Sequence, residues 1–249
     1  MDSVKVKKFN PKENFLNEKT LLITGAGSGI GKDVALSAAK FGANLILLSK
    51  DAKKLYALQD EVNKNFGLDP LVIEFDFLKA KHQDYEKLGE ALYQEYESLD
   101  ALVNIAGILG YLSPLISTSE QQLKTVMRVN FESNFLLSQI CLPLLLKGEN
   151  SSIIFTSSGV GRKGRAFWTS YSISKFATEG LMQVLADEYE GQLRVNSYNP
   201  GPTKTAMRAQ AFPAEDPNTL KTPKDRALDY LWLLSDENLT SGCAYDFSE

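Results

Sequence analysis

The chain places a glycine-rich turn directly between an apolar, β-rich run and a run with helical periodicity, and this order restricts its fold more than any other feature. The apolar run covers residues 20–24, and the helical run begins near residue 30. The turn comprises Gly25, Gly27, Ser28, Gly29, Ile30 and Gly31. Glycine allows a tight turn and lets backbone N–H groups approach a pyrophosphate, which then lies at the positive end of the helix dipole. The turn predicts a dinucleotide site, with an ordinary glycine-rich turn as the alternative.

Short apolar runs alternate with longer amphipathic runs along the rest of the chain. The predicted strands are Thr20–Thr24, Asn44–Leu48, Pro70–Phe75, Asp100–Asn104, Ser151–Thr156, Leu193–Asn199 and Cys243–Asp246. The predicted helices are Ile30–Phe41, Ala52–Phe66, Lys81–Glu97, Glu120–Lys147, Tyr171–Glu190 and Pro223–Leu234. This alternation is typical of βαβ units. We therefore predict a three-layer α/β fold with a doubly wound parallel sheet of about seven strands. No linker divides the chain, so we expect one domain at 18–249, an extension at 1–17 and a substrate loop near 200–223.

Composition excludes several classes of function. The 27 basic and 31 acidic residues give a net charge of -4, which provides no general attraction to nucleic acid or to an anionic membrane. The single histidine and the two separated cysteines, Cys141 and Cys243, support neither a metal site nor a disulfide framework. No secretory signal follows the basic N-terminal residues, and no apolar run is long enough to cross a bilayer. We expect a cytoplasmic protein of a reducing compartment.

The end of the second predicted strand bears on the choice of cofactor. An acidic residue there would bind the ribose 2′-hydroxyl of NAD and repel the 2′-phosphate of NADP. The strand runs into Ser49, Lys50 and Asp51. Asp51 is a candidate for that acid, but it is also placed to cap the following helix. Because Ser49 carries no charge and Lys50 attracts phosphate, the sequence favours NADP over NAD, with a simply solvated lysine as the alternative.

One tyrosine is followed four residues later by a lysine on a predicted helix. This spacing places Tyr171 and Lys175 on one helix face. A phenol with its ordinary pKa near ~10 is a poor base, and a nearby cation is expected to lower that pKa. The pair therefore predicts proton transfer to a carbonyl or from an alcohol. A core tyrosine beside a surface lysine is the alternative.

Taken together, the motifs resemble the short-chain dehydrogenase/reductase family in its GxxxGxG/YxxxK branch. The match extends from about residue 18 to the C-terminus. It rests on Gly25, Gly29 and Gly31, Asn130, Ser158, Tyr171 and Lys175, and Pro200-Gly201. More narrowly, the segments 144–147, 161–165, 175–180 and 211–213 are similar to bacterial YciK-type oxidoreductases. The resemblance implies a Rossmann fold that binds NADP(H).

The resemblance also implies a role for each matching residue. Tyr171 is expected to be the general acid/base, and Lys175 to lower its pKa and bind the nicotinamide ribose. Ser158 is expected to bind the substrate oxygen, and Asn130 to hold a water in a proton relay. The further cofactor contacts it implies are Asp76 and Phe77 at the adenine, Ala106 and Gly107 near the ribose, and Pro200, Gly201, Thr203 and Thr205 near the carboxamide.

Two residues depart from the family pattern. Ile105 stands where the family usually has a second asparagine, so a polar contact near the adenosine ribose is lost. Thr203 stands where an apolar β-branched residue is common, and little effect is expected because the contact is made by backbone. The basic loop at 162–165 could bind an anionic substrate group, or its arginines could pair with acids of a partner subunit.

The sequence thus predicts an oxidoreductase that transfers a hydride between NADP(H) and a small carbonyl or alcohol. A catalytically silent dinucleotide-binding sensor or scaffold is the alternative, and a sugar-nucleotide epimerase is disfavoured by the glycine spacing and the absence of a longer substrate domain. Apolar residues surround two predicted helices, and we expect these helices to pair in a homodimer or homotetramer. They are Phe135, Leu136, Leu137, Ile140 and Leu144 on the first, and Phe176, Leu181, Met182 and Leu185 on the second.

Overall fold

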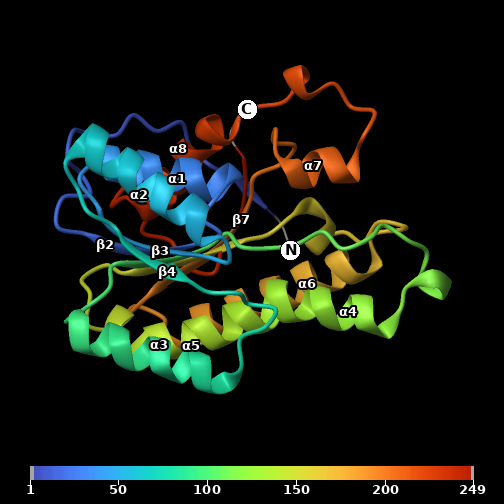
Figure 1. Cartoon of the computed structure of the whole chain (residues 1–249), viewed down its shortest axis with the longest axis horizontal. Helices are drawn as coiled ribbons and strands as arrows, with labels where there is room; N and C mark the ends of the chain where they lie inside the picture. Colours follow the sequence, from blue (N-terminus) through green and yellow to red (C-terminus); the bar gives the residue numbers. More distant parts are fainter. Residues whose placement is uncertain (1–2, 248–249) are drawn as a thin grey trace.

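The computed structural model describes residues 3–247, which form one parallel sheet with helices on both faces (Figure 1). The strands are β1 (Val4–Lys5), β2 (Thr20–Thr24), β3 (Asn44–Ser49), β4 (Leu71–Glu74), β5 (Ala101–Asn104), β6 (Ser152–Thr156), β7 (Arg194–Asn199) and β8 (Ala244–Asp246). Their order is β1-β8-β7-β6-β5-β2-β3-β4, and all neighbouring pairs are parallel. The predicted α/β fold with a doubly wound parallel sheet is confirmed.

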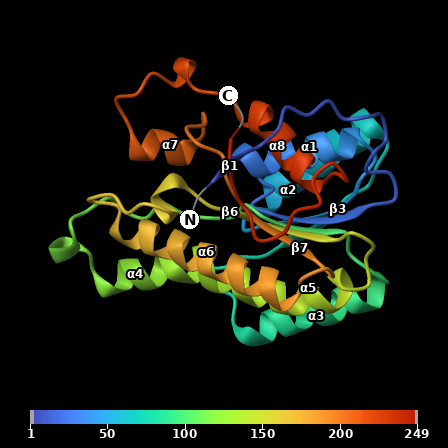
Figure 2. The same cartoon turned by 180° about the vertical axis from the view of Figure 1, so that it is seen from behind.

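The helices divide into two layers. They are α1 (Gly29–Lys40), α2 (Ala52–Phe66), α3 (His82–Glu95), α4 (Glu120–Met127), α5 (Ser133–Leu145), α6 (Thr169–Glu188), α7 (Ala206–Ala211) and α8 (Pro223–Leu234). In Figures 1 and 2, α1, α2 and α8 cover one face of the sheet, whereas α3, α5 and α6 cover the other and α4 lies along α6. Helix α7 stands apart from both layers, beyond the ends of the strands.

Alternating side chains of the central strands supply two separate cores. In β2, Leu21 and Ile23 belong to the core under α1 and α8, while Leu22 belongs to the core under α3 and α5. Strand β3 repeats the pattern. Successive side chains of a strand point to opposite faces, so a strand buried on both sides consists of apolar residues throughout. This explains why the strands appear in the sequence as continuous apolar runs.

The sheet has one strand more than the seven or so that the sequence predicts. The additional strand is β1, which pairs with β8 at the edge. Val4 and Lys5 are both exposed, and a strand of only two residues gives no apolar run in the sequence. The rest of this segment packs on the domain, since Leu16 is buried and the Phe15 ring lies 5.3 Å from that of Phe41.

Local capping residues explain where the helices around the sheet begin. The Asp51 side chain accepts a hydrogen bond from the backbone of Lys54 and caps α2. At the start of α8, Thr222 and Asp225 form a reciprocal capping box, with Pro223 in the first turn. Such side chains satisfy the N–H groups that a helix leaves unpaired at its N-terminus.

The predicted helix 120–147 is divided into two helices. One turn of π-helix, Arg128–Glu132, separates α4 from α5. Within it, the Val129 carbonyl accepts a hydrogen bond from the Ser133 hydroxyl, 2.6 Å away. The extra residue of a π turn shifts the helix face, and such turns occur frequently at functional sites. Hydrophobic periodicity does not reveal it, because both halves remain helical.

The single histidine lies at the surface of the protein. His82 is the first residue of α3, is exposed and faces Glu86 at 3.5 Å, as a surface residue would. Within residues 3–247, no group of three or more His, Cys, Asp or Glu side chains could hold a metal ion. In the same part of the chain, no helix has the length and apolar character that crossing a membrane requires.

Tight packing between β2 and α1 generates a prediction about stability. A Cβ atom on Gly31 would lie 2.3 Å from the backbone oxygen of Gly25, so α1 would have to move away from the turn. We expect Gly31→Ala to lower the free energy of unfolding by about 1–3 kcal/mol, the range for overpacked sites. The measurement is denaturant unfolding followed by circular dichroism.

The matched control is Gly164→Ala, which adds the same methyl group where no atom lies within 4 Å. It is expected to change the free energy of unfolding by less than about 0.5 kcal/mol. Equal stability of the two variants would show that the β2–α1 contact is not tight.

Candidate active site

The glycine turn forms the floor of a cavity of about 580 Å³ at the carboxyl ends of the strands. Gly25 and Gly29 have positive φ angles of 69° and 56°, and a Cβ on Gly25 would lie 2.9 Å from the backbone nitrogen of Ala106. Only glycine satisfies both the backbone angle and the close approach. Gly25, Ser28, Gly29 and Ile30 line the cavity, whereas Gly27 and Gly31 lie behind the turn.

The N-terminus of α1 faces this cavity without a competing negative charge. Ser28 occupies the capping position, but its side chain accepts no capping hydrogen bond, and the first turn contains no acidic residue. Helix N-termini bind anions through free N–H groups and the helix dipole. The turn therefore fits a pyrophosphate group, as the sequence predicts.

The end of β3 presents Ser49 and Lys50 to the same cavity. Asp51 does not line it, because its carboxylate caps α2 and pairs with Lys54 at 3.3 Å. The hydrogen bond from the Lys54 backbone also lowers the pKa of Asp51. The sequence allows Asp51 to be either a ribose-binding acid or a helix cap, and the structure supports the helix cap. The charge that faces the cavity at this strand is positive.

The ends of β4 and β5 complete this half of the cavity. Asp76, Phe77, Ala106 and Gly107 all line it. The Thr24 hydroxyl accepts hydrogen bonds from the backbone nitrogens of Ile105 and Ala106, at 2.9 and 3.0 Å. The backbone at Ile105, where the sequence departs from the family pattern, is thus held by Thr24 of β2. The isoleucine side chain packs against the core under α1.

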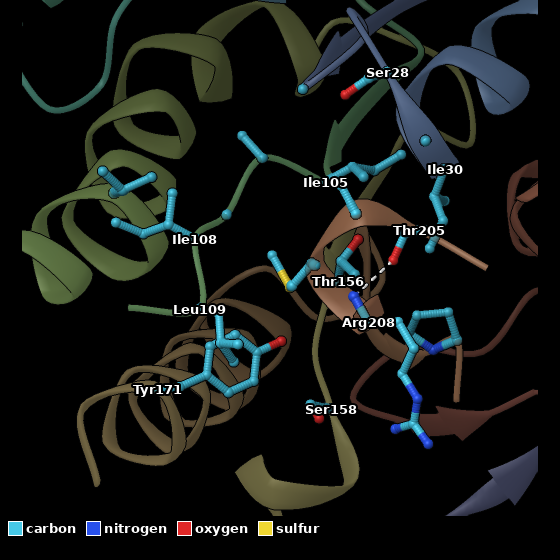
Figure 3. Close-up of a pocket in the computed structure, with 18 of the residues that line it drawn as sticks. Ser28, Ile30, Ile105, Ile108, Leu109, Thr156, Ser158, Tyr171, Thr205 and Arg208 are labelled. Atoms are coloured by element: carbon cyan, nitrogen blue, oxygen red, sulfur yellow. Dashed lines mark hydrogen bonds between the residues drawn. The ribbon is translucent and has the colours of Figure 1, made fainter. Parts of the chain in front are cut away.

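Ser158, Tyr171 and Lys175 line the other half of the cavity, and Figure 3 shows the first two. Ser158 follows β6, and the other two lie one turn apart on α6. The Lys175 ammonium donates to the Thr156 carbonyl at 2.7 Å and lies 5.7 Å from the centroid of the Tyr171 ring. Tyr171 and Lys175 are only 8% and 3% exposed, so their polar groups are withdrawn from bulk water.

Burial controls the protonation of both groups. It raises the pKa of the Tyr171 phenol to about 12, and the hydrogen bond with Ser158 offsets only part of the rise. It lowers the pKa of the Lys175 ammonium to about 8, against the opposing effect of Glu179. The pKa of the phenol is thus raised, not lowered as the sequence predicts, because desolvation of the phenolate is the largest effect. At neutral pH the phenol holds its proton and can donate it.

Asn130 lies in the π turn and does not line the cavity. Its side chain accepts from the Ile108 nitrogen at 2.8 Å and donates to the Ile108 carbonyl at 2.9 Å and to the Ser174 hydroxyl at 3.0 Å. Ile108 lines the cavity, and Ser174 precedes Lys175 in α6. Asn130 thus joins the loop after β5 to the helix that carries the lysine.

The segment after β7 closes the cavity from the far side. Pro200, Gly201, Thr203 and Thr205 line it. Gly201 adopts a φ of 64°, and its nitrogen donates to the Asn199 side chain at 3.0 Å. Thr205 accepts from the Arg208 nitrogen and so caps α7 (Figure 3). Most of the predicted contacts therefore converge on one cavity, and Asn130, Gly27 and Gly31 support it from behind.

This combination of fold and site is that of a known family. Residues 19–216 match the model of the short chain dehydrogenases. The chain belongs to that family. It is 46% identical over 230 residues to the uncharacterized oxidoreductase YciK of Escherichia coli strain K12, covering 92% of this chain and 91% of the relative.

Solved structures agree with this assignment. An oxidoreductase structure, yciK from E. coli, is 44% identical with a TM-score of 0.94 and covers 96% of this chain and 99% of that one. A short chain dehydrogenase from E. coli CFT073, complexed with NADPH, is 46% identical with a TM-score of 0.93 and covers 95% and 99%. The resemblance to YciK-type oxidoreductases that the sequence indicates is confirmed.

In this short chain dehydrogenase, several residues that line the cavity were not singled out by sequence. They are Phe75, Leu78, Ile108, Leu109, Val129, Thr156, Ser157, Trp168, Asn199, Ala206, Met207, Arg208 and Ala211. Arg208 is the charged residue of α7. The segment around it is polar and proline-rich, and its sequence does not indicate that a short helix places the arginine at the cavity.

The basic loop at 162–165 contains two different kinds of arginine. Arg162 is nearly buried and pairs with Glu179 at 2.9 Å and with Asp246 at 2.8 Å. It therefore pairs with acids of its own chain. Arg165 is exposed and stacks on aromatic rings, with its guanidinium carbon 5.8 Å from the ring centroid of Trp168.

Proposed function

We propose that this protein is an oxidoreductase that transfers a hydride between NADP(H) and a small carbonyl or alcohol substrate, with Tyr171 as general acid/base. One observation carries the proposal: Ser158, Tyr171 and Lys175 line the same cavity as the glycine turn and Lys50. Two relatives with TM-scores of 0.92 and 0.93 are described as complexed with NADP and NADPH. The matching fold over nearly the whole chain supports the same cofactor here.

The cavity residues fit a phosphorylated dinucleotide. The open N-terminus of α1 would bind the pyrophosphate, and Lys50, with the uncharged Ser49 beside it, would meet the 2′-phosphate. Asp76 and Phe77 would lie at the adenine, Ala106 and Gly107 near the ribose, and Thr203 and Thr205 near the carboxamide. When bound, the cofactor supplies the hydride to the carbonyl carbon.

The protein's own residues manage the proton. In the reduction, Tyr171 donates its proton to the carbonyl oxygen as that oxygen gains negative charge, while the Ser158 hydroxyl donates a hydrogen bond to it. The phenolate that remains lies near the Lys175 ammonium, which stabilises it. In the oxidation the same phenolate takes the proton of the alcohol. The near-complete burial of both side chains excludes water from this transfer.

Asn130 is proposed to supply the route by which the proton is replaced. Both of its amide hydrogens are used, by the Ile108 carbonyl and the Ser174 hydroxyl, and Oδ1 accepts one hydrogen bond from Ile108. An amide oxygen can accept two hydrogen bonds, so one acceptor position on Oδ1 is left for a water. A Cβ on Gly107 would lie 3.3 Å from this oxygen and 3.9 Å from the Lys175 nitrogen, so such a water would be adjacent to the lysine.

A silent dinucleotide-binding sensor is the alternative. All four residues of the proton-transfer set are present, and three of them line the cavity. A sensor has no use for a buried tyrosine and lysine at the cavity wall. Turnover distinguishes the two functions directly.

We also propose that the protein forms a homodimer through α5 and α6, or a tetramer of two such dimers. On their outer faces, Phe135, Phe176 and Val184 are 45%, 45% and 53% exposed. Leu137, Leu144, Met182 and Leu185 are buried within the protomer and are not available for a partner. Ile140 packs against Gly89 of α3, where an added Cβ would approach it to 3.2 Å. The apolar surface is therefore smaller than the sequence suggests.

The first prediction concerns cofactor preference. We expect NADPH to bind at least about tenfold more tightly than NADH, because a charged hydrogen bond is worth about 1.5–3 kcal/mol and about 1.4 kcal/mol is a factor of ten. Lys50→Gln should reduce this ratio, and Lys53→Gln, at an exposed position outside the cavity, should not. Both ratios are measured by nucleotide fluorescence. A ratio near one in the unmodified protein would refute the proposed role of Lys50.

The second prediction separates catalysis from binding. We expect Tyr171→Phe to keep NADPH affinity and lose turnover by at least ~100-fold, because the phenol is the proton donor. Lys175→Ala should weaken both, because the lysine serves the ribose and the phenol. The measurement is consumption of reduced nicotinamide with a panel of aldehydes, ketones and quinones. Binding of NADPH with no turnover of any carbonyl would favour the sensor, and an active Tyr171→Phe variant would place the chemistry on another residue.

The third prediction concerns assembly. Phe176→Lys and Val184→Lys each place a charge on the proposed interface, so we expect them to shift a dimer toward monomers in analytical ultracentrifugation. The control is Tyr56→Lys, at an equally exposed aromatic position on α2. A protein that is monomeric at micromolar concentration, or variants that stay assembled, would contradict this interface.

A further inference from the structure

Arg208 is the one cationic side chain of α7 that lines the cavity. Its Nε and Nη2 atoms each donate to the carboxylate of Glu215 at 2.6 Å, and its guanidinium carbon lies 3.8 Å from the centroid of the Phe212 ring. The side chain is 23% exposed, so the pair is only partly hydrated. Within residues 3–247, the third nitrogen, Nη1, donates to no protein acceptor. The Arg208 guanidinium is thus held by Glu215 and Phe212, while its Nη1 group is available to donate a hydrogen bond to a ligand.

A second arginine lies on the same aromatic cluster. Arg165 has its guanidinium carbon 5.6 Å from the centroid of Phe212 and 5.8 Å from that of Trp168. In the described part of the chain, Arg165 forms no ion pair. Among the described residues, Glu215 is the only carboxylate paired with these two guanidinium groups, which leaves one excess positive charge beside Trp168, a residue of the cavity wall. Arginine with a free donor edge is suited to bind a carboxylate.

The surface between these two arginines and Tyr171 is apolar. The Trp168 ring lies 5.8 Å from that of Tyr171 on one side and 5.8 Å from that of Phe212 on the other. Leu109 and Met207 line the same cavity. In Figure 3, Tyr171, Ser158 and Arg208 face one opening. A flat apolar body fits against such a wall.

From this arrangement we propose that the substrates are carbonyl compounds with an apolar, aromatic-sized body and a carboxylate, and that Arg208, assisted by Arg165, binds the carboxylate. The carbonyl lies at Tyr171 and Ser158, and the body lies against Trp168. This assignment rests on the proposed function. Glu215 holds Arg208 on Phe212 and, as a negative charge, weakens its attraction for a second carboxylate. Glu215 is thereby also a specificity-determining residue, and its effect on carboxylate binding is opposite to that of Arg208.

The test compares two probes that differ mainly in charge, 4-carboxybenzaldehyde and its neutral amide, 4-formylbenzamide. The measured quantity is the ratio of their kcat/KM values, so that changes common to both probes cancel. We expect the carboxylate to be preferred at least about tenfold, since 1.4 kcal/mol of differential binding gives that factor. Arg208→Gln should abolish the preference, and Arg165→Gln should reduce it. Glu215→Gln should increase it, because the arginine loses its counter-charge.

Opposite effects of Arg208→Gln and Glu215→Gln distinguish recognition from a structural role. If the pair only holds α7 in place, both variants lower kcat/KM for both probes and leave the ratio unchanged, which overturns the proposal. Lys163→Gln is the matched control, because it removes an exposed charge from the same loop without an aromatic contact. A change of the ratio in that variant as large as in Arg208→Gln would also overturn the assignment, since any nearby charge would then suffice.

A binding measurement separates this inference from the proposed function. Benzoate and benzamide are titrated into the protein loaded with NADPH, with the fluorescence of Trp168 as the signal and a Trp168→Phe protein as the blank. Preference for benzoate that is lost in Arg208→Gln supports the carboxylate site even if no aldehyde is reduced, in which case only the proposed reaction fails. Reduction of 4-formylbenzamide without any preference for the carboxylate probes refutes the inference and leaves the reaction intact.

Discussion

The close contact between the β2 turn and the β5 turn sets the geometry on which the rest of the site depends. The strand order reverses here, with β3 on one side of β2 and β5 on the other. In doubly wound sheets the crevice at this switch point is where ligands bind. Gly25 approaches Ala106 so closely that a methyl group would be 2.9 Å from its backbone nitrogen. The two turns therefore lie close together, and residues of both line the cavity.

Burial shifts the pKa values of Tyr171 and Lys175, the two side chains proposed to manage the proton. Tyr171 and Lys175 are withdrawn from water, which favours the neutral form of each. The Thr156 carbonyl replaces part of the hydration that the lysine loses, and Glu179, which lies one turn further along α6, opposes the fall in the pKa of Lys175. With a pKa of about 8, Lys175 is still mostly charged at neutral pH. At neutral pH the pair is thus a phenol and an ammonium, which are the states that the proposed mechanism requires.

The sequence predicts those parts of the molecule that local pattern determines. Apolar runs and capping residues such as Asp51 identify the central strands and helices, and the YxxxK spacing identifies one helix face. Features that depend on distant contacts were not predictable. Strand β1 exists because β8 offers an edge, the π turn because Asn130 reaches Ile108 and Ser174, and the cavity position of Arg208 because Glu215 and Phe212 hold it. The direction of the Tyr171 pKa was missed for a related reason, since spacing shows a cation but not the loss of water.

Arg162 shows how residues outside the cavity determine its shape. It follows the short turn after Ser158, and its guanidinium bonds to Glu179 of α6, to Asp246 of β8 and to the Tyr245 carbonyl. Gly161 beside it packs so closely on α6 that a Cβ would lie 2.7 Å from that of Lys175. Because breaking a buried pair leaves an uncompensated charge and costs about 3–5 kcal/mol, this arrangement resists displacement. The distance between Ser158 and the Tyr171–Lys175 face is therefore held by a salt-bridge network whose residues, Arg162, Glu179 and Asp246, do not line the cavity.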